Sequence, residues 1–386
     1  MRIALSGWFW TYPNTGSGQY LRCLLKALVE HHPDTTFMLL APPDRVAGQE
    51  IIPGISPIPV PAPRGALGKV WWEQIALPLA VRRSKADLLH VPYWGPPLFS
   101  SVPVIATVHD LIPLLLPEYR GSRAVRLYTR LVSLTARRAA LLLTDSNASR
   151  ADILQHLRVT STRVQAIPLA VDESYSPKGC PEDVELLQAL GLEPGYILYL
   201  GGFDSRKNLR AVFGAFAKVR REMGGAARLV VAGRLPTHDS AFAPDPRRLM
   251  QEAGLEPDAV HFTGFVPEST KPALYRGARA FFFPSRYEGF GLPPLEALAC
   301  GVPVVGSATS SIPEVVGKAG FLTDPDDIDG MAEALLRLLH EEALRQTLHR
   351  CAVEQAAQFS WEKTAQATYT AYRQAKPESS SETFRV

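Results

Sequence analysis

Residues 280–306 read AFFFPSRYEGFGLPPLEALACGVPVVG, and they contain one complete unit of the fold. The apolar runs at 280–283 and 302–306 are short and uninterrupted, which is typical of strands that are buried on both faces of a sheet. Between them, Pro293 and Pro294 predict the start of a helix, where a missing N–H group costs nothing. A strand, a helix and a second strand in this order predict an α/β fold with a parallel sheet.

The same alternation extends over the rest of the chain. Further short apolar runs predict strands at residues 2–6, 37–40, 88–91, 104–109, 141–145, 196–200, 228–232 and 321–323. Stretches with the helical spacing of apolar residues predict helices between most of these runs, at residues 19–30, 68–82, 123–138, 148–157, 206–222, 247–254, 270–278, 293–300 and 328–339. Residues 172–195 interrupt the pattern, because they are rich in Pro, Gly and acidic residues and contain no predicted strand. The chain of 386 residues is therefore predicted to form two α/β domains.

We place the boundary between these domains near residues 176–181. An N-terminal domain then covers residues 1–178, and a C-terminal domain covers residues 179–358. A last helical stretch occupies residues 359–376. The tail at residues 377–386 is rich in Ser and Glu and is expected to be flexible.

Composition and charge exclude several classes of protein. A content of 46% hydrophobic and 20% charged residues is that of an ordinary globular protein, so extensive disorder is excluded. The net charge of +3 does not indicate nucleic-acid binding. It conceals a basic half at residues 1–180, with a net charge of +7, and a remainder with a net charge of −4. The densest basic stretch, residues 120–138, fits either a helix that lies on an anionic surface or a solvated helix face.

Cysteine spacing and the length of the apolar runs indicate a cytoplasmic protein. The four cysteines stand far apart without a C-x-x-C pair, which excludes a zinc ribbon and argues against a disulfide scaffold. The first residues contain only a short apolar run, so we expect no signal peptide. No apolar run reaches the roughly 18 residues that a membrane span needs. Any contact with a membrane is therefore expected to be peripheral.

The loop of the opening stretch contains two glutamates, Glu288 and Glu296, in the pattern E-x7-E. Open parallel sheets bind ligands at the carboxyl ends of their strands, and the N-terminus of the following helix favours an anion. Gly289 and Gly291 allow the backbone to approach such a ligand. Carboxylates beside an anion site are suited to hydrogen-bonding the hydroxyl groups of a sugar or a ribose. The alternative is that both glutamates only favour the start of the helix.

Two adjacent cations follow another predicted strand. In GGFDSRKN, residues 201–208, Arg206 and Lys207 lie at the start of a helix, where the helix dipole disfavours positive charge. An anion that needs neutralising explains them better. A phosphate or pyrophosphate fits, since Arg can bind it through two N–H groups and Lys as a point charge. The alternative is that both side chains point into solvent.

The N-terminal half contains two further candidates. Gly16 and Gly18 resemble the start of a dinucleotide fingerprint, but Leu21 replaces the third glycine, so NAD binding is rejected. A glycine loop that approaches a phosphate or a sugar is the weaker interpretation that we keep. His109 ends a predicted strand and would stand at the carboxyl edge of the sheet, although a lone histidine is commonly structural. The sequence contains no motif of a serine hydrolase, a P-loop NTPase or a zinc protease.

Four segments together resemble the retaining, nucleotide-sugar-dependent glycosyltransferases of family 4. They are residues 285–307 with E-x7-E, the segment GGFDSRKNL, the segment HDLIP and the N-terminal glycine loop. The resemblance implies the GT-B fold, in which two Rossmann-like domains face each other across a cleft. The acceptor would bind the N-terminal domain and the donor mainly the C-terminal domain. The last helix would cross back to the N-terminal domain.

The resemblance also implies a role for individual residues. Arg206 and Lys207 would bind the donor diphosphate and stabilise the leaving nucleoside diphosphate, so that no metal and no other cofactor is expected. Glu288 would contact the transferred sugar, Glu296 the ribose, and His109 the sugar and the reacting centre. Further donor contacts are implied for Gly16, Gly18, Gly202, Phe265, Val266, Gly289, Phe290, Gly291 and Leu292.

The activity that we expect is transfer of a hexose, with retention of configuration, from a nucleotide-diphosphate sugar of the GDP-mannose or UDP-glucose type. The acceptor would be a sugar hydroxyl of a lipid-linked or polysaccharide substrate, reached by docking of the basic N-terminal domain on the inner membrane surface. Two alternatives stay open: a two-lobed nucleotide-sugar binding protein without turnover, and a sugar-nucleotide epimerase with the same fold. Slow hydrolysis of the donor would distinguish an enzyme from a binding protein.

Overall fold

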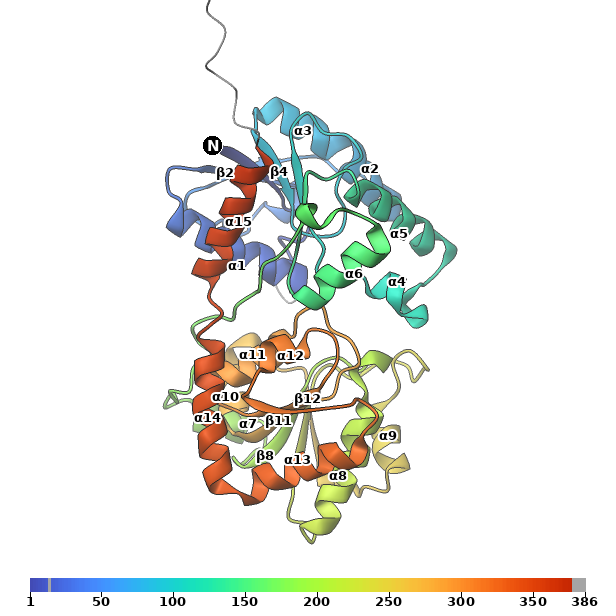
Figure 1. Cartoon of the computed structure of the whole chain (residues 1–386), viewed down its shortest axis with the longest axis vertical. Helices are drawn as coiled ribbons and strands as arrows, with labels where there is room; N and C mark the ends of the chain where they lie inside the picture. The colour runs from blue at the N-terminus through green and yellow to red at the C-terminus, as the bar shows by residue number, and fades with distance from the viewer. Residues whose placement is uncertain (13–14, 377–386) are drawn as a thin grey trace, which may run out of the picture. The chain divides into compact units, whose positions relative to one another are not determined.

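The computed structural model describes residues 1–12 and 15–376, and its chain divides into two compact units (Figure 1). The first unit is Met1–Leu169 with the chain from Ser360 onward, and the second unit is Ala170–Phe359. The tail at residues 377–386, for which we predicted flexibility, lies outside the described residues.

Residues 170–178, which we assigned to the N-terminal domain, pack in the second unit. The ring of Tyr175 lies 6.1 Å from the ring of Tyr275. Arg276, on the same helix as Tyr275, donates a hydrogen bond of 3.2 Å to the carbonyl oxygen of Ser176. These contacts hold the connecting segment against the second unit, which is why the division at Leu169 precedes the Pro- and Gly-rich stretch.

The first unit contains a sheet of seven parallel strands in the order β3-β2-β1-β4-β5-β6-β7. The strands are β1 (Arg2–Ser6), β2 (Thr36–Ala41), β3 (Ile55–Pro59), β4 (Leu88–Val91), β5 (Val104–Thr107), β6 (Leu141–Thr144) and β7 (Val164–Ala166). Strands β4, β5 and β6 are buried at every residue, which explains their uninterrupted apolar sequences. The α/β fold predicted from the sequence is confirmed in this unit.

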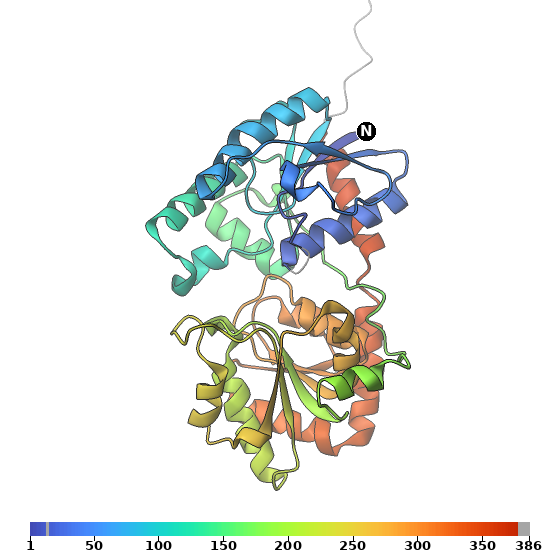
Figure 2. The same cartoon turned by 180° about the vertical axis from the view of Figure 1, so that it is seen from behind.

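Helices surround this sheet (Figure 1). They are α1 (Gly16–His31), α2 (Ala66–Trp71), α3 (Leu77–Ser84), α4 (Ile112–Leu115), α5 (Arg123–Ala136), α6 (Asn147–Leu157) and α15 (Trp361–Ala375). Helices α2 and α3 are joined by a π-helical turn, Trp72–Ala76, and appear as one continuous helix in Figure 2. Helix α15 packs against α1, and its Tyr372 hydroxyl shares a hydrogen bond of 2.7 Å with Nδ1 of His90 on β4.

The second unit contains a sheet of six parallel strands in the order β10-β9-β8-β11-β12-β13. The strands are β8 (Tyr196–Leu200), β9 (Leu229–Ala232), β10 (Val260–Gly264), β11 (Ala278–Phe283), β12 (Val304–Ser307) and β13 (Gly320–Thr323). Figure 2 shows these strands running side by side with helices on either side. The opening stretch of the sequence therefore forms β11, the following helix and β12, as predicted.

The helices of the second unit complete its core. They are α7 (Asp183–Ala189), α8 (Leu209–Glu222), α9 (Pro246–Glu252), α10 (Lys271–Arg276), α11 (Leu292–Ala299), α12 (Ile312–Val316), α13 (Ile328–His340) and α14 (Glu342–Ala356). Phe213 and Phe216 of α8 pack with Phe282 of β11 and Leu335 of α13, and all four are fully buried. This packing fixes the carboxyl edge of the sheet, where β8 and β11 end.

The strand order reverses once in each sheet, between β1 and β4 in the first unit and between β8 and β11 in the second. Loops that follow the two strands at such a point diverge and leave a crevice at the carboxyl edge. In the second unit these loops are residues 201–208 and 284–291. In the first unit one of them follows β1, and the other follows β4. Both predicted donor motifs thus meet at one reversal point.

Candidate functional site

The loops after β8 and β11 bring Arg206, Lys207 and Glu288 into one ion cluster. Lys207 Nζ lies 2.6 Å from Glu288 Oε1, and Arg206 Nη1 lies 2.7 Å from Glu288 Oε2. The side chains of Lys207, Arg206 and Glu288 are only 9%, 17% and 11% exposed. Glu288, the first glutamate of the E-x7-E motif, therefore pairs with both cations of the segment GGFDSRKN.

Asn208 fixes the two cations by holding the turn that carries them. Its backbone is left-handed, with φ of 58°, a conformation that Asn tolerates better than most residues. Its side-chain amide donates hydrogen bonds of 3.2 Å and 2.7 Å to the carbonyl oxygens of Pro284 and Pro325. The backbone N–H of Arg286 also donates to the carbonyl oxygen of Arg206 at 2.7 Å. The loop after β8 is thereby bound to the loop after β11.

Three serines hold Glu288, and sequence reasoning did not identify them. Ser285 Oγ donates a hydrogen bond of 2.6 Å to Glu288 Oε1. Ser311 Oγ contacts the backbone carbonyl oxygens of Glu288 at 3.0 Å and Phe290 at 2.6 Å. Ser310 also exchanges hydrogen bonds with the backbone of Glu288. For Ser310 and Ser311 the available signal was SATSS, residues 307–311, which follows the predicted strand at 302–306. Ser285 lies in the loop that carries Glu288.

The electrostatic environment keeps Glu288 ionised. Burial by itself would raise the pKa of Glu288, but the charges of Lys207 and Arg206 and the hydrogen bonds from Lys207 and Ser285 outweigh burial and lower it. Asp204 lies 3.1 Å from Arg206 Nε and supplies a second negative charge. The cluster therefore holds two cations and two carboxylates close together at a carboxyl edge.

Glu296, the second glutamate of the E-x7-E motif, contacts residues outside the ion cluster. It is buried in α11, and the Tyr275 hydroxyl donates a hydrogen bond of 2.7 Å to its Oε2. Burial raises the pKa of Glu296, and the charge of Lys271 offsets this only in part. The two glutamates of one motif thus have pKa values shifted in opposite directions. Its predicted contact with a ribose stays a prediction.

The other predicted donor residues of the second unit differ in exposure. Phe265 is 53% exposed, and Arg234 lies 5.3 Å above its ring. Val266 and Phe290 are buried, whereas Gly202 is exposed and Gly289 and Leu292 are half-buried. Gly291 precedes α11 with φ of 114°, a conformation that requires glycine. These positions stay predictions as ligand contacts.

In the first unit, His109 pairs with Asp145 at the carboxyl edge of the sheet. His109 follows β5 and Asp145 follows β6, and His109 Nδ1 lies 2.7 Å from Asp145 Oδ2. The ring centroids of His109 and Tyr20 lie 4.9 Å apart, with the two rings nearly perpendicular at 86°. Burial would lower the pKa of His109, but the charge and the hydrogen bond of Asp145 outweigh burial and raise it. Asp145 thus holds the imidazole in one orientation.

This pair predicts a pH-dependent stability. Because the folded-state pKa of His109 lies above the ordinary value of 6.5, the stabilisation is fully present below that pH and is lost as the pH rises through the folded pKa. We expect the free energy of unfolding of the first unit to fall across this window, and Asp145→Asn to flatten the fall. Tryptophan fluorescence during urea unfolding measures it, since all six tryptophans lie in the first unit. Equal pH slopes in both proteins would contradict the assignment.

The glycine loop before α1 shows a packing role for Gly18. A Cβ atom on Gly18 would lie 1.9 Å from the carbonyl oxygen of Tyr12, whereas a Cβ on Gly16 would meet nothing within 4 Å. Thr15 caps the helix by accepting a hydrogen bond from the N–H of Gly18 at 3.3 Å. Asn14 lies outside the described residues. Tight local packing therefore accounts for Gly18, and contacts of this loop with a phosphate stay a prediction.

The two glycines form a matched pair of variants. Gly18→Ala is expected to lower the unfolding free energy of the first unit by about 1–3 kcal/mol, the usual cost of overpacking. Gly16→Ala should change it by less than about 0.5 kcal/mol, as a substitution in open space does. Urea unfolding followed by tryptophan fluorescence measures both. Equal effects of the two substitutions would refute the packing role.

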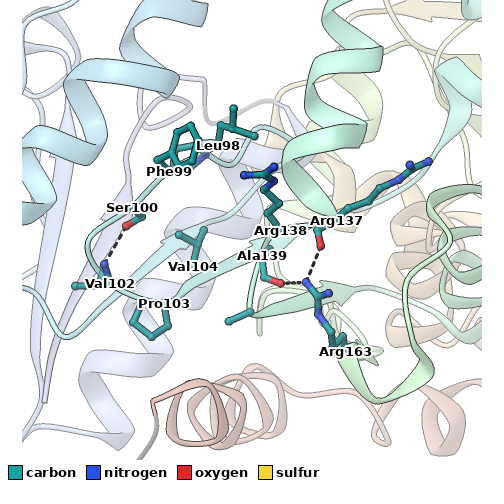
Figure 3. Close-up of a pocket in the computed structure, with 12 residues that line it drawn as sticks. Leu98, Phe99, Ser100, Val102, Pro103, Val104, Arg137, Arg138, Ala139 and Arg163 are labelled. Atoms are coloured by element: carbon teal, nitrogen blue, oxygen red, sulfur yellow. Dashed lines mark hydrogen bonds between the residues drawn. The ribbon is translucent and has the colours of Figure 1, made fainter.

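A hollow of about 580 Å³ opens at the start of β5, and arginines are among the residues that line it (Figure 3). Its cationic groups do not converge. Arg163 donates to the carbonyl oxygens of Arg137 and Ala139, Arg138 extends toward the exposed ring of Phe99, and Arg137 points away. The hollow lies at the amino ends of the strands, the edge opposite His109. It is therefore a weaker candidate for a substrate site.

No group of three or more His, Cys, Asp or Glu residues that could hold a metal ion is found in residues 1–12 and 15–376.

Comparisons with known proteins identify relatives of both units. The family model "Glycosyl transferases group 1" matches residues 188–355, and the model "Glycosyltransferase Family 4" matches residues 14–175. An O-antigen chain mannosyltransferase B from Escherichia coli is 35% identical over 270 residues, which are 70% of each chain. The serotype-specific mannosyltransferase WbdA from the same species is 32% identical over 266 residues, but these cover only 32% of its length.

Solved structures show the same fold. Sucrose-phosphate synthase from Thermosynechococcus elongatus superposes with a TM-score of 0.75 at 24% identity, over 97% of this chain and 98% of that one. Anabaena HepE in complex with UDP and glucose superposes with a TM-score of 0.73 at 20% identity, over 97% and 100% of the two chains.

Proposed function

The chain belongs to the group 1 glycosyl transferases of glycosyltransferase family 4, and from this premise we propose that it moves a hexose from a nucleotide-diphosphate sugar to a hydroxyl of a saccharide acceptor. The observation that supports this most is the ion cluster of Arg206, Lys207 and Glu288 at the reversal point of the second sheet. Such a point is where open α/β sheets bind nucleotides. Two cations on one side of it suit a diphosphate.

The proposed reaction proceeds with retention of configuration and without a metal. Arg206 and Lys207 stabilise the negative charge that develops on the leaving diphosphate, and electrostatic stabilisation of this kind is usually the largest single contribution to catalysis. The bond from the sugar to the phosphate oxygen breaks as the acceptor oxygen attacks from the same face. The departing phosphate oxygen takes the acceptor proton. Glu288 keeps both cations in place and contacts the transferred sugar. His109 is a further proposed contact of the sugar.

The donor is proposed to be of the GDP-mannose or UDP-glucose type. A relative 35% identical to this chain is named a mannosyltransferase, which favours mannose. Arg206 and Lys207 can bind the diphosphate of either donor, so other residues must select the nucleotide base. Phe265, which is half-exposed beside Arg234, is the proposed contact for the base.

The acceptor is proposed to be a lipid-linked or polysaccharide substrate at the inner face of the cell membrane. Helix α5 exposes Arg123, Arg126 and Arg130 together with Leu127, which is 68% exposed. A basic helix with exposed apolar residues can lie on an anionic lipid surface. Among the described residues, none of the helices has the length and apolar character to cross a bilayer. Binding to anionic vesicles should weaken as salt is added.

A thermal-shift screen of UDP, GDP, ADP and their sugars tests the donor. One nucleotide should raise the unfolding temperature of the second unit, because a ligand that binds only the folded state stabilises it. The sugar donor that contains this nucleotide should be hydrolysed slowly to free sugar and nucleoside diphosphate when no acceptor is present. Binding without any hydrolysis or transfer would instead support a binding protein. If none of the nucleotides stabilised the protein, both the transferase function and the binding-protein function would be excluded.

A further inference from the structure

A cluster of aromatic and charged side chains occupies the reversal point of the first sheet, and the donor chemistry does not use it. The loop after β1 carries Trp8 and Phe9, and Tyr93 follows β4. Ser6, the last residue of β1, donates a hydrogen bond of 3.2 Å to the Tyr93 hydroxyl, which joins the two strand ends. By the same topological rule as in the second unit, this crevice is where a ligand is expected.

Lys69 lies inside a cage of aromatic rings at this point. Its Nζ is 5.5 Å from the ring of Phe9, 5.3 Å from that of Tyr93 and 4.9 Å from that of Tyr128. The side chain of Lys69 remains 25% exposed. Tyr128 comes from α5, so three separate parts of the unit converge on one cation.

Glu73 lies beneath this cation and is fully buried. Its Oε1 is 3.4 Å from Lys69 Nζ, and the Tyr128 hydroxyl lies 3.0 Å from each of its carboxylate oxygens. A Cβ on Gly95 would lie 2.8 Å from Oε1, so the chain after β4 also closes over the carboxylate. Burial raises the pKa of Glu73, and Lys69 and Tyr128 offset this only in part.

Two features of Glu73 indicate more than packing. It belongs to the π-helical turn Trp72–Ala76, and π-helical turns inside helices are frequent at functional sites. Burying a carboxylate to form an ion pair is also a poor way to gain stability, because apolar side chains of similar size usually stabilise as well or better. A carboxylate whose pKa is shifted by burial beside a specific cation is a recognised mark of a functional site.

We propose that this cluster is the acceptor subsite, in which Phe9 stacks on an uncharged pyranose, Lys69 and Tyr128 bind its hydroxyl groups, and Glu73 is the positioning residue that orients them. This proposal rests on the proposed function, because a bound saccharide is an acceptor only if the protein is a glycosyltransferase. Aromatic rings suit the apolar face of a sugar ring, and a few fixed polar groups set its orientation. Glu73 neutralises Lys69, so the pair attracts hydroxyl groups rather than a phosphate.

The test uses the whole chain and three probes: the methyl glycosides of α-D-mannose, α-D-glucose and β-D-galactose. Saturation-transfer NMR should detect binding of at least one of them to the wild-type protein. Lys69→Met and Tyr128→Phe should each weaken that affinity at least fivefold. Lys26→Met, on the exposed face of α1, is the matched control and should leave it within twofold. Salt at 0.5 M should change the affinity less than twofold, because no net charge attracts the ligand.

Glu73→Gln separates a positioning role from packing. If Glu73 positions the ligand-binding groups, the substitution should weaken the affinity for the sugar even when the unfolding transition measured by tryptophan fluorescence is unchanged. If Glu73 has only a structural role, the substitution should shift the unfolding transition and leave the affinity for the sugar unchanged. No binding of any probe, unchanged affinity in Lys69→Met and Tyr128→Phe, or a strong dependence on salt would overturn the proposal. If sugars bind here while no nucleotide stabilises the second unit and no nucleotide sugar is hydrolysed, the proposed function fails and the saccharide site stands.

Discussion

Lys207→Ala is expected to lower kcat/KM for donor hydrolysis by about 10²–10³, the usual loss when one preorganised group that stabilises a developing anion is removed. Lys207 Nζ lies 2.6 Å from Glu288 and 4.8 Å from the ring of Phe283, and its side chain is only 9% exposed. Water therefore cannot readily replace the missing charge, and added salt screens it little. The loss should appear mainly in kcat, because the charge on the leaving diphosphate develops in the transition state.

Lys218→Ala is the matched control. Lys218 lies on α8, only a short distance further along the chain, and pairs with Asp329 at the surface, where its side chain is 41% exposed. An exposed pair of this kind contributes little, so the activity of this variant should stay within twofold of the wild type. Activity of Lys207→Ala within twofold of the wild type would remove the cation from the proposed mechanism.

The sequence predicts the central strands of both sheets and one edge strand, β13, and misses the other three edge strands. The predicted strands at residues 2–6 and 196–200 coincide with β1 and β8, which are buried at nearly every residue. The strands that escaped prediction are β3, β7 and β10, and each lies at the edge of its sheet. An edge strand is covered on fewer sides, so its sequence shows no continuous apolar run. In β3 only Ile55 is buried among its five residues.

Helix α14 escaped prediction for a related physical reason. Only Leu348 and Ala352 of its fifteen residues are buried, so a clear apolar stripe is missing. Its neighbour α13 buries six residues along one face and was recognised from that pattern. Amphipathic spacing therefore identifies the helices that build the core and misses those that cover it.

The candidate site was predictable as two motifs but not as one cluster. Arg206, Lys207 and Glu288 were each identified from local spacing beside a predicted strand. Their mutual contacts depend on β8 and β11 being neighbours, although β9 and β10 lie between them in the chain. The residues that hold the motifs together, such as Asn208 and Ser311, form hydrogen bonds to distant backbone carbonyl groups. No periodicity in a sequence records such contacts.

Glu288→Ala is expected to destabilise the second unit by about 3–5 kcal/mol, the usual cost of removing one partner from a buried ion pair. The substitution leaves Arg206 and Lys207 close together in a poorly hydrated site without the carboxylate that both contact. Calorimetry should show a lower unfolding temperature for the second unit. The tryptophan-fluorescence transition should be unchanged, because all six tryptophans lie in the first unit. Asp329→Ala, which breaks a surface ion pair, should cost no more than about 1 kcal/mol.

Pyrophosphate distinguishes an anion site from a purely structural ion cluster. In the wild type, pyrophosphate must compete with Glu288 for the two cations, whereas in Glu288→Ala it meets them without a competing carboxylate. The same concentration should therefore raise the unfolding temperature of the variant more than that of the wild type, as expected for a ligand that binds only the folded state. If pyrophosphate raised the unfolding temperature of Glu288→Ala no more than that of the wild type, Arg206 and Lys207 would serve only to pair with Glu288. A donor diphosphate would then have to be bound by other residues.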